Sequence, residues 1–376
     1  MRKLKTLQLL ILISSLSLAG CFDFSTNSKS KETPIGLNLL WDYAYDLDGG
    51  APSVKPLLHG SMIITSGDIN VTSLKFETGE MIWKTPFEHH MQLMNRSFGF
   101  QNNVIAGSVV KKIMTWNVTD GQELFSFSFP DSLSFNDFKG ISTTETSLIA
   151  VSNGRNLYKL DHEGNLNIIP LNARSYETTV HNNVLFAGQR MGDEGIVSAY
   201  NVHTMELLWS FNPGSFGFFS REAPIVENNI VYVGTTDGPT GSRNGFFALN
   251  AQTGEEIWRR EGIFTYSAVL AGDRIFGVNG QRVWALDKHT GELLWITQGR
   301  GGHSESNLDY LDGYVYWAHG GGLHVFNAES GELLHVMPAP DGSFFWRVTA
   351  GAGRIFAQSN RHLYAFAPWG HTQPLD

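Results

Sequence analysis

A short motif that recurs about every forty residues organises this sequence. Its clearest form is Thr-Gly-Glu, two further residues and Trp, as in Thr78-Gly79-Glu80 with Trp83 and Thr253-Gly254-Glu255 with Trp258. The aligned last positions of the intact and decayed copies are Trp83, Phe125, Ile168, Trp209, Trp258, Trp295 and His335, spaced by 37 to 49 residues. Self-similarity at this period, in segments of strand-like composition, indicates a propeller of four-stranded blades.

The repeat that begins at Glu222 shows how four strands fit into one unit. We expect strands at 223–226, 230–234, 246–250 and 256–260, with the pair Asn228-Asn229 turning the chain between the first two. Such pairs tolerate the positive φ of tight hairpins. They recur as Asn102-Asn103, Asn182-Asn183, Gly272-Asp273 and Asp312-Gly313. Because no helical period separates the hairpins, we predict an all-β fold.

A count of the strands predicts the number of blades and the way the ring closes. Third strands appear eight times, but outer strands follow only seven of them before the chain ends. The eight are centred near Leu74, Trp116, Tyr158, Ala199, Ala248, Ala285, Val325 and Ala365. We expect the missing outer strand at 39–43, paired with residues near Tyr364, which would protect the edges of an open sheet. We therefore predict an eight-bladed β-propeller of four-stranded antiparallel blades, closed by its amino-terminal strand.

The tryptophans of the motif have a structural explanation. Gly supplies the turn conformation, and Thr or Ser can hydrogen-bond the local backbone. The Trp ring can then lie between neighbouring blades with its N–H satisfied. We expect this docking role, in preference to a cofactor role, for Trp41, Trp83, Trp209, Trp258 and Trp295.

The amino-terminal segment is predicted to be a targeting signal followed by a flexible tether. A basic start precedes an apolar run at 7–18 that is too short to span a bilayer, and Leu18-Ala19-Gly20 leads into Cys21, the single cysteine of the chain. This pattern resembles a bacterial lipobox. We predict a lipoprotein signal peptide at 1–20, a lipidated Cys21 with a flexible tether at 21–36, and one propeller at 37–376. An ordinary secretory signal with an accidental cysteine is the alternative.

The repeat also carries a family resemblance. The runs Ala-Leu-Asn-Ala-Gln-Thr-Gly-Glu-Glu-Ile-Trp at 248–258 and Ala-Leu-Asp-Lys-His-Thr-Gly-Glu-Leu-Leu-Trp at 285–295 resemble the tryptophan-docking repeat of the pyrroloquinoline quinone (PQQ) dehydrogenase-like propellers. That superfamily contains dehydrogenases and non-catalytic scaffolds. The resemblance therefore implies a fold more strongly than a function.

Lipobox, tether and a lone propeller of this size together resemble the lipoprotein subunit of the outer-membrane β-barrel assembly machinery. The resemblance implies a non-catalytic, monomeric periplasmic scaffold that binds an envelope protein, with the barrel-assembly complex as first candidate. Phe22 directly after Cys21 favours the outer membrane.

The same resemblance suggests partner-binding residues. The family's docking loop places apolar residues and an Arg before a Ser-Ala-Pro strand start, and the corresponding residues here are Phe218, Phe219, Arg221 and Glu222. The family's second, acidic docking patch is replaced by Thr265-Tyr266-Ser267. A lipoprotein of another envelope system with the same fold therefore stays open as an alternative.

Other aromatic loops lead from an outer strand to the next inner strand and should gather on the same face. Such clusters are typical interface anchors. For Phe344, Phe345 and Trp346, packing in the channel is an equally good interpretation.

A quinone- or small-ligand-binding propeller, either a sensor or a dehydrogenase, is the alternative function. The alcohol dehydrogenases of the superfamily resemble one another in adjacent cysteines over the quinone and a calcium site, whereas this chain has one Cys. His89 and His90 point to opposite faces of a strand and have no third ligand at a plausible spacing, so we expect no metal. The net charge of −9 argues against nucleic acid. We therefore predict no cofactor and no catalytic residues.

Overall fold

The structure is a computed structural model that describes residues 36–375, apart from 47–53, 68, 88–92, 94–96, 110, 131–137, 153–154, 172, 192–193, 220–221, 237–242 and 301–306. The predictions for Cys21, the signal peptide and the tether, together with those for His89, His90 and Arg221, fall outside the described residues. The propeller belongs to one compact unit, Gly36–Asp376. No helix in the described part of the chain is long and apolar enough to cross a membrane.

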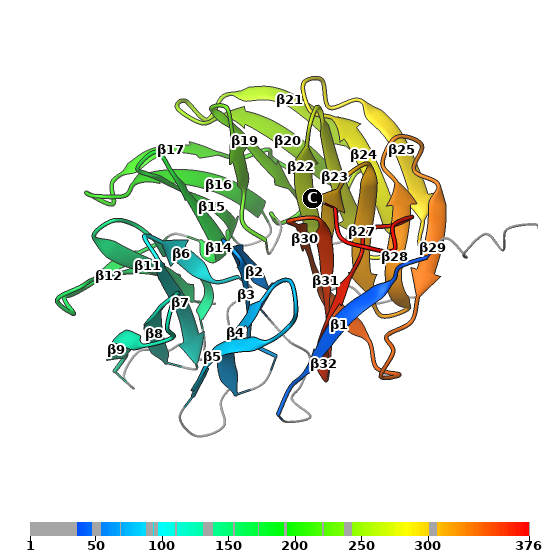
Figure 1. Ribbon diagram of the computed structural model, residues 1–376. Coiled ribbons are helices and arrows are strands. Elements are labelled where there is room, and N and C mark those ends of the chain that lie inside the picture. The colour runs from blue at the N-terminus through cyan, green and yellow to red at the C-terminus, as the bar shows by residue number, and fades with distance from the viewer. Residues whose placement is uncertain are drawn as a thin grey trace, which may run out of the picture. The chain divides into compact units, whose positions relative to one another are not determined.

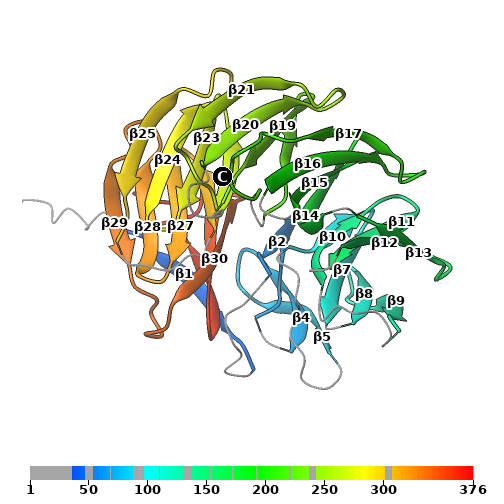
Figure 2. The same cartoon turned by 180° about the vertical axis from the view of Figure 1, so that it is seen from behind.

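Eight four-stranded antiparallel sheets form the blades of a ring, and the blades follow one another in chain order (Figures 1 and 2). The first two blades are β2 (Leu57–His59), β3 (Met62–Thr65), β4 (Asn70–Lys75), β5 (Met81–Pro86), and β6 (Gly99–Gln101), β7 (Val104–Val109), β8 (Lys112–Asn117), β9 (Glu123–Ser128). The next two are β10 (Phe138–Thr143), β11 (Ser147–Ser152), β12 (Asn156–Asp161), β13 (Leu166–Pro170), and β14 (Arg174–His181), β15 (Val184–Met191), β16 (Glu194–Asn201), β17 (Leu207–Phe211). Blades 5 and 6 are β18 (Ile225–Glu227), β19 (Ile230–Gly234), β20 (Gly245–Asn250), β21 (Glu256–Glu261), and β22 (Ser267–Ala271), β23 (Arg274–Asn279), β24 (Arg282–Asp287), β25 (Leu293–Gln298). Blades 7 and 8 are β26 (Leu308–Leu311), β27 (Tyr314–His319), β28 (Gly322–Asn327), β29 (Leu333–Met337), and β30 (Phe345–Gly351), β31 (Arg354–Ser359), β32 (His362–Phe366), β1 (Leu39–Ala44).

The amino-terminal strand supplies the outer strand of the last blade. Strand β1 pairs antiparallel with β32, and Asp42 stands opposite Tyr364. In Figure 1 the blue β1 lies beside the red β32. The last blade is also joined to the first, because Thr349 Oγ1 donates a 2.8 Å hydrogen bond to the carbonyl of Pro56. The strand pairing therefore agrees with the prediction from the strand count.

The predicted strands match the structure closely except at one inner strand. Each of the eight predicted third-strand centres lies in the third strand of a blade. Strand β18, however, begins at Ile225 and not at 223. The Ala223 N–H donates to Glu177 Oε2 at 3.3 Å, and the Pro224 carbonyl accepts from Thr179 Oγ1. These two residues thus bond to blade 4 before the chain joins its own sheet.

The asparagine pairs between first and second strands adopt the expected left-handed conformation. Asn228 and Asn229 have φ of 49° and 62°, and Asn182 and Asn183 have almost the same values, 48° and 61°. Two successive residues with positive φ are characteristic of the hairpin turn that matches the twist of the flanking strands. Asn is one of the few residue types that tolerate this conformation, so the turns are determined locally.

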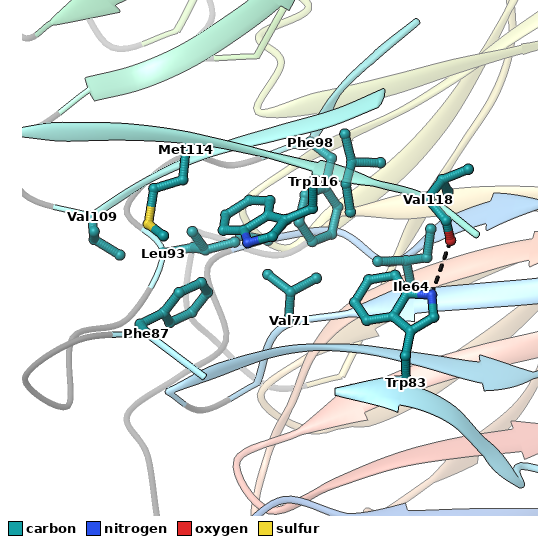
Figure 3. Close-up of a cluster of buried hydrophobic side chains, with 12 residues drawn as sticks. Ile64, Val71, Trp83, Phe87, Leu93, Phe98, Val109, Met114, Trp116 and Val118 are labelled. Carbon is teal, nitrogen blue, oxygen red and sulfur yellow. Dashed lines mark hydrogen bonds between the residues drawn. The ribbon is translucent and has the colours of Figure 1, made fainter. Parts of the chain in front are cut away.

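The hydrophobic core lies between successive blades. One cluster joins Ile64, Val71 and Trp83 of blade 1 to Trp116 and Val118 in the region of blade 2 (Figure 3). The indole Nε1 of Trp83 donates to the Val118 carbonyl at 3.0 Å, shown as a dashed line in Figure 3. Each blade therefore buries its apolar face against the next one, which explains why single blades need the ring.

The five motif tryptophans share one geometry. The indole N–H of each donates, at 3.0 to 3.2 Å, to a carbonyl of the next blade in the ring. Each ring also lies on the motif glycine of that blade, where an added Cβ would approach the indole to between 2.4 and 2.6 Å. The pairs are Trp41 with Gly79, Trp83 with Gly121, Trp209 with Gly254, Trp258 with Gly291 and Trp295 with Gly331.

The pattern changes where the tryptophan is absent. Blade 3 has Ile168 in place of Trp, with 39% of its surface exposed. Blade 4 correspondingly has Met205 in place of Gly, still with a positive φ of 60°. In blade 7 the ring of His335 lies 5.1 Å from that of Trp369, in the carboxyl-terminal segment. Glycine is thus needed in the turn chiefly where an indole covers it.

Candidate functional site

The candidate site is built around the loop 212–219, which leads from β17 of blade 4 toward β18 of blade 5. Asn212 begins it: its Oδ1 accepts the Gly214 N–H at 2.7 Å, and its Nδ2 donates to Glu194 Oε2 at 2.7 Å. An Asn side chain that accepts the N–H two residues later mimics a backbone turn, so it can hold a loop that has no regular secondary structure. The loop therefore leaves blade 4 in a defined direction.

Backbone bonds to blade 5 hold the rest of the loop. Gly217 N–H donates to the Arg243 carbonyl at 2.8 Å, and Arg243 N–H donates to the Ser215 carbonyl at 3.0 Å. Further on, Thr236 N–H donates to the Phe218 carbonyl at 2.6 Å. Blade 4 closes the other side, since a Cβ on Gly195 would lie 2.6 Å from the Gly217 carbonyl oxygen. The loop is thus clamped between two blades.

Phe219 lies in the core, which corrects the prediction that it is a surface anchor. Its side chain is 1% exposed and lies 5.9 Å from the ring of Phe247. Neighbouring residues of an extended segment point to opposite sides, so Phe218 and Phe219 cannot both face outward. Phe219 is the inward residue: it forms an antiparallel bridge with Thr235, which is 0% exposed, and bridged residues place their side chains on the same side.

Phe218 is half-buried and carries a cation–π contact. The guanidinium carbon of Arg190, on β15, lies 3.8 Å from the centre of the Phe218 ring. In the sheet, Arg190 stands opposite Arg174 of β14. A contact of this kind contributes about 0.5–1 kcal/mol at an exposed site and orients the aromatic ring. Phe218 therefore keeps its predicted place at the surface, beside an arginine that the sequence analysis did not select.

A second aromatic–arginine group lies on the same loop. Phe216 is buried, at 0% exposure, and the guanidinium carbons of Arg243 and Arg259 lie 4.6 Å and 5.6 Å from its ring centre. Arg243 pairs with Glu261 at 3.3 Å, and Arg259 pairs with Glu256 at 2.6 Å. The hydrogen bond with Glu256 raises the pKa of Arg259. Both arginines are exposed, so these ion pairs add little stability and instead present charge at the surface.

Glu222 lies near the boundary between blades 5 and 6. With Tyr232 and Thr265 it lines a cavity of about 20 Å³. Burial raises the pKa of Tyr232 to about 12, so this phenol stays protonated at neutral pH. The predicted set is thus divided: Phe218 lies at the surface, Phe219 in the core and Glu222 over this cavity, while Arg221 is outside the described residues.

The aromatic residues at the start of blade 8 include one exposed ring and one buried ring, so both interpretations from the sequence, surface anchor and packing, apply to part of the group. Phe344 is 54% exposed, whereas Phe345 is 1% exposed and packs against Tyr364. Trp346 is half-buried, and its indole N–H donates to Asn360 Oδ1. Of the three rings, only that of Phe344 is exposed.

No three His, Cys, Asp or Glu side chains within the described ranges lie close enough together to hold a metal ion. The single cysteine, Cys21, belongs to the amino-terminal segment and cannot form an adjacent pair.

Comparisons with known proteins place these features in a family. The family described as outer membrane protein assembly factor BamB matches the chain over residues 67–261 and 193–370. Quinoprotein alcohol dehydrogenase PedH of Pseudomonas putida is 25% identical over 187 residues, 43% of this chain and 30% of that protein. BamB of Kangiella koreensis is 27% identical over 142 residues, 33% of this chain and 35% of that protein. The crystal structure of BamB from Moraxella catarrhalis is similar at a TM-score of 0.68 and 15% identity, covering 88% of this chain and 98% of that one.

These likenesses differ in what they show. The chain spans about a third of the length of the curated relatives it matches first, and those relatives include both quinoproteins and assembly factors. The likeness to the crystal structure, at 15% identity, shows the fold. The family match is broader, because its two overlapping segments together run from residue 67 to residue 370. On that ground the chain belongs to the family of outer membrane protein assembly factor BamB.

Proposed function

We propose that this protein is a non-catalytic scaffold of the cell envelope that works in outer-membrane barrel assembly and binds a partner protein through the loop 212–219 and its arginines. The observation that carries the proposal is the pair of aromatic–arginine contacts, Arg190 on Phe218 and Arg243 on Phe216. Aromatic and Arg side chains dominate binding energy at protein interfaces. A loop already held by backbone bonds loses little entropy on binding.

The proposed location is the periplasmic side of the outer membrane, with Cys21 as the lipidated residue. The lipobox and the polar segment at 23–36 support it, as do relatives named for outer-membrane protein assembly. The test is fractionation of cells that express Cys21→Ser with an ordinary cleavable secretory signal in place of residues 1–20, because loss of the lipobox cysteine also blocks cleavage of its own signal. We expect the variant to leave the membrane fraction, whereas wild type stays in it through detergent-free washing. A variant that stays in the membrane fraction would contradict lipid anchoring.

Partner binding is tested with the intact lipoprotein purified from gently solubilised envelopes. We expect wild type to recover a subunit of the barrel-assembly complex in near-stoichiometric amount by mass spectrometry, and Phe218→Ala with Arg190→Ala to lose at least tenfold of it. Phe344→Ala is the matched control, because it removes an exposed ring from another loop. An unchanged yield from the double variant would contradict the proposed surface, and a different envelope partner would contradict the barrel-assembly role.

A quinone-binding function has one observation in its favour, the similarity to the dehydrogenase PedH over 187 residues. Its test is the unfolding temperature of the purified chain with PQQ and calcium, alone and together. A ligand that binds only the folded protein raises this temperature. A rise with both, but not with calcium alone, would favour the quinone function and count against the scaffold.

A further inference from the structure

The face of the ring opposite the loop 212–219 has a groove between blades 6 and 7. Its volume is about 420 Å³, and its walls come from the turns 271–274 and 312–314 and from 327–329. These turns join first to second strands and third to fourth strands. In an antiparallel blade such turns lie at the end opposite the connections between blades. The groove is therefore distinct from the surface proposed above and does not depend on that proposal.

The neighbouring blade boundary shows how the chain fills the same position with a cation. Between blades 5 and 6, Lys288 Nζ lies 2.7 Å from Glu227 Oε2 and 2.6 Å from the Gly272 carbonyl oxygen. Alignment of the repeats places Ala328 at the position of Lys288 and Ala271 at that of Glu227. The Trp N–H bonds agree with this alignment, because Trp258 donates to Lys288 and Trp295 donates to Ala328. At the boundary of blades 6 and 7, two alanines thus replace an ion pair and leave the groove open.

Aromatic rings and carboxylates line the open groove. Phe276 and Tyr310 are stacked, with ring centres 5.6 Å apart and planes 5° from parallel, and Tyr314 adds a third ring. Three carboxylates, those of Asp273, Asp312 and Glu329, and one guanidinium, that of Arg274, leave a formal charge of −2. A ligand of this groove must match both the aromatic rings and the negative charge.

Arg274 does not offer a free cation to the groove. Its guanidinium donates to the carbonyl of Ala328 at 2.6 Å and to Glu329 Oε2 at 2.5 Å. Asp312, at the tip of the turn, is exposed. The face of an aromatic ring attracts cations, and a cleft lined by one sign of charge concentrates the opposite sign.

We propose that this groove binds a basic side chain, lysine or arginine, of an extended partner polypeptide. The aliphatic stem would lie along the rings and the charged end among the carboxylates, as amphipathic side chains pack elsewhere. At the equivalent position of the boundary between blades 5 and 6, the chain itself has a lysine, Lys288. The volume lies within the range of pockets that hold small ligands, so it accommodates a side chain with its flanking backbone.

The test measures binding of three tripeptides to the full chain by saturation-transfer NMR: acetyl-Gly-Lys-Gly-amide and its Arg and Gln counterparts. We expect the Lys and Arg peptides to bind at least tenfold more tightly than the Gln peptide. The double variant Ala271→Glu, Ala328→Lys rebuilds the ion pair of the neighbouring boundary, and we expect it to lose at least tenfold of this binding. Equal binding of the Gln peptide, or full binding by this variant, would overturn the proposal.

Two further measurements keep the test decisive. Asp273→Asn with Asp312→Asn removes exposed charge without filling the groove, and we expect at least fivefold weaker binding even if the filled variant fails to fold. Unchanged binding there would count against the proposal. The diamine putrescine distinguishes the source of the cation: tighter binding of putrescine than of the Lys peptide would make the occupant a small polyamine and the proposal wrong.

Discussion

The indole of Trp209 lies directly on Gly254 of the next blade: a Cβ at Gly254 would stand 2.5 Å from Trp209 Cε3. The same tryptophan donates its N–H to the Ala251 carbonyl at 3.0 Å, so one turn receives both the ring and the hydrogen bond. Gly254 has a φ of 74°, which side chains disfavour. Backbone conformation and blade packing therefore select glycine at the same position.

Gly254→Ala should destabilise the propeller far more than Gly164→Ala. Both glycines have positive φ, but nothing lies within 4 Å of a Cβ at Gly164. Gly164→Ala therefore carries only the backbone strain, about 1–2 kcal/mol. Gly254→Ala must also displace the indole, which adds about 1–3 kcal/mol. Urea unfolding of the two variants measures the difference, and equal losses would show that the indole moves at no cost.

Blade 3 can be given the missing tryptophan only together with a glycine in blade 4. Ile168→Trp alone meets the side chain of Met205, which is only 6% exposed. Ile168→Trp with Met205→Gly restores the geometry of the other boundaries. A double-mutant cycle in urea should give a favourable coupling energy of about 0.5–3 kcal/mol. Additive effects would mean that the two positions do not meet.

Phe219→Ala and Phe218→Ala should separate stability from binding. Phe219 is almost fully buried, so its truncation should lower the free energy of unfolding by about 3–5 kcal/mol. Phe218 is half-buried beside Arg190, and its truncation should change stability by about 1 kcal/mol or less. The measurements are thermal unfolding and partner recovery on the same preparations. A loss of partner from Phe219→Ala, with Phe218→Ala unaffected in a stable protein, would reverse the assignment.

Asp341 should make the last blade sensitive to acid. Burial by itself would raise the pKa of its carboxyl, but hydrogen bonds from Ser359, Ser343 and His362 outweigh it and lower the pKa to about 2. Because the folded pKa lies below the ordinary value of 3.8, this stabilisation is complete above pH 4 and is lost as the pH falls toward 2. It amounts to about 2 kcal/mol.

The variant Asp341→Asn tests that contribution. It should unfold more easily than wild type at pH 7, and the difference should shrink as the pH falls from 4 to 2. Asp273→Asn is the control, since the side chain of Asp273 is 83% exposed. A constant difference between wild type and Asp341→Asn at every pH would show that the carboxyl is not charge-stabilised.

Much of the fold could be predicted because its rules are local. The turn pairs, such as Asn228-Asn229, require particular residue types whatever surrounds them, and the repeat of Trp and Gly marks each blade boundary. Eight third strands against seven outer ones then required β1 to join β32. Only the start of β18 was displaced, because Ala223 and Pro224 bond to Glu177 and Thr179 of another blade.

The blades, their number and their order follow from the repeat alone, since each depends on residues within one repeat. The packing of the blades, in contrast, forms the candidate surfaces. It turned Phe219 inward and Phe218 outward, and it brought Arg190 and Arg243 to the loop from other strands. It also opened the groove at Ala271 and Ala328. These two residues are 57 positions apart, and neither of them by itself indicates a groove in the sequence. The physical reason is that hairpins form from neighbours in the chain, whereas surfaces and cavities form from side chains that only the packing of blades brings together.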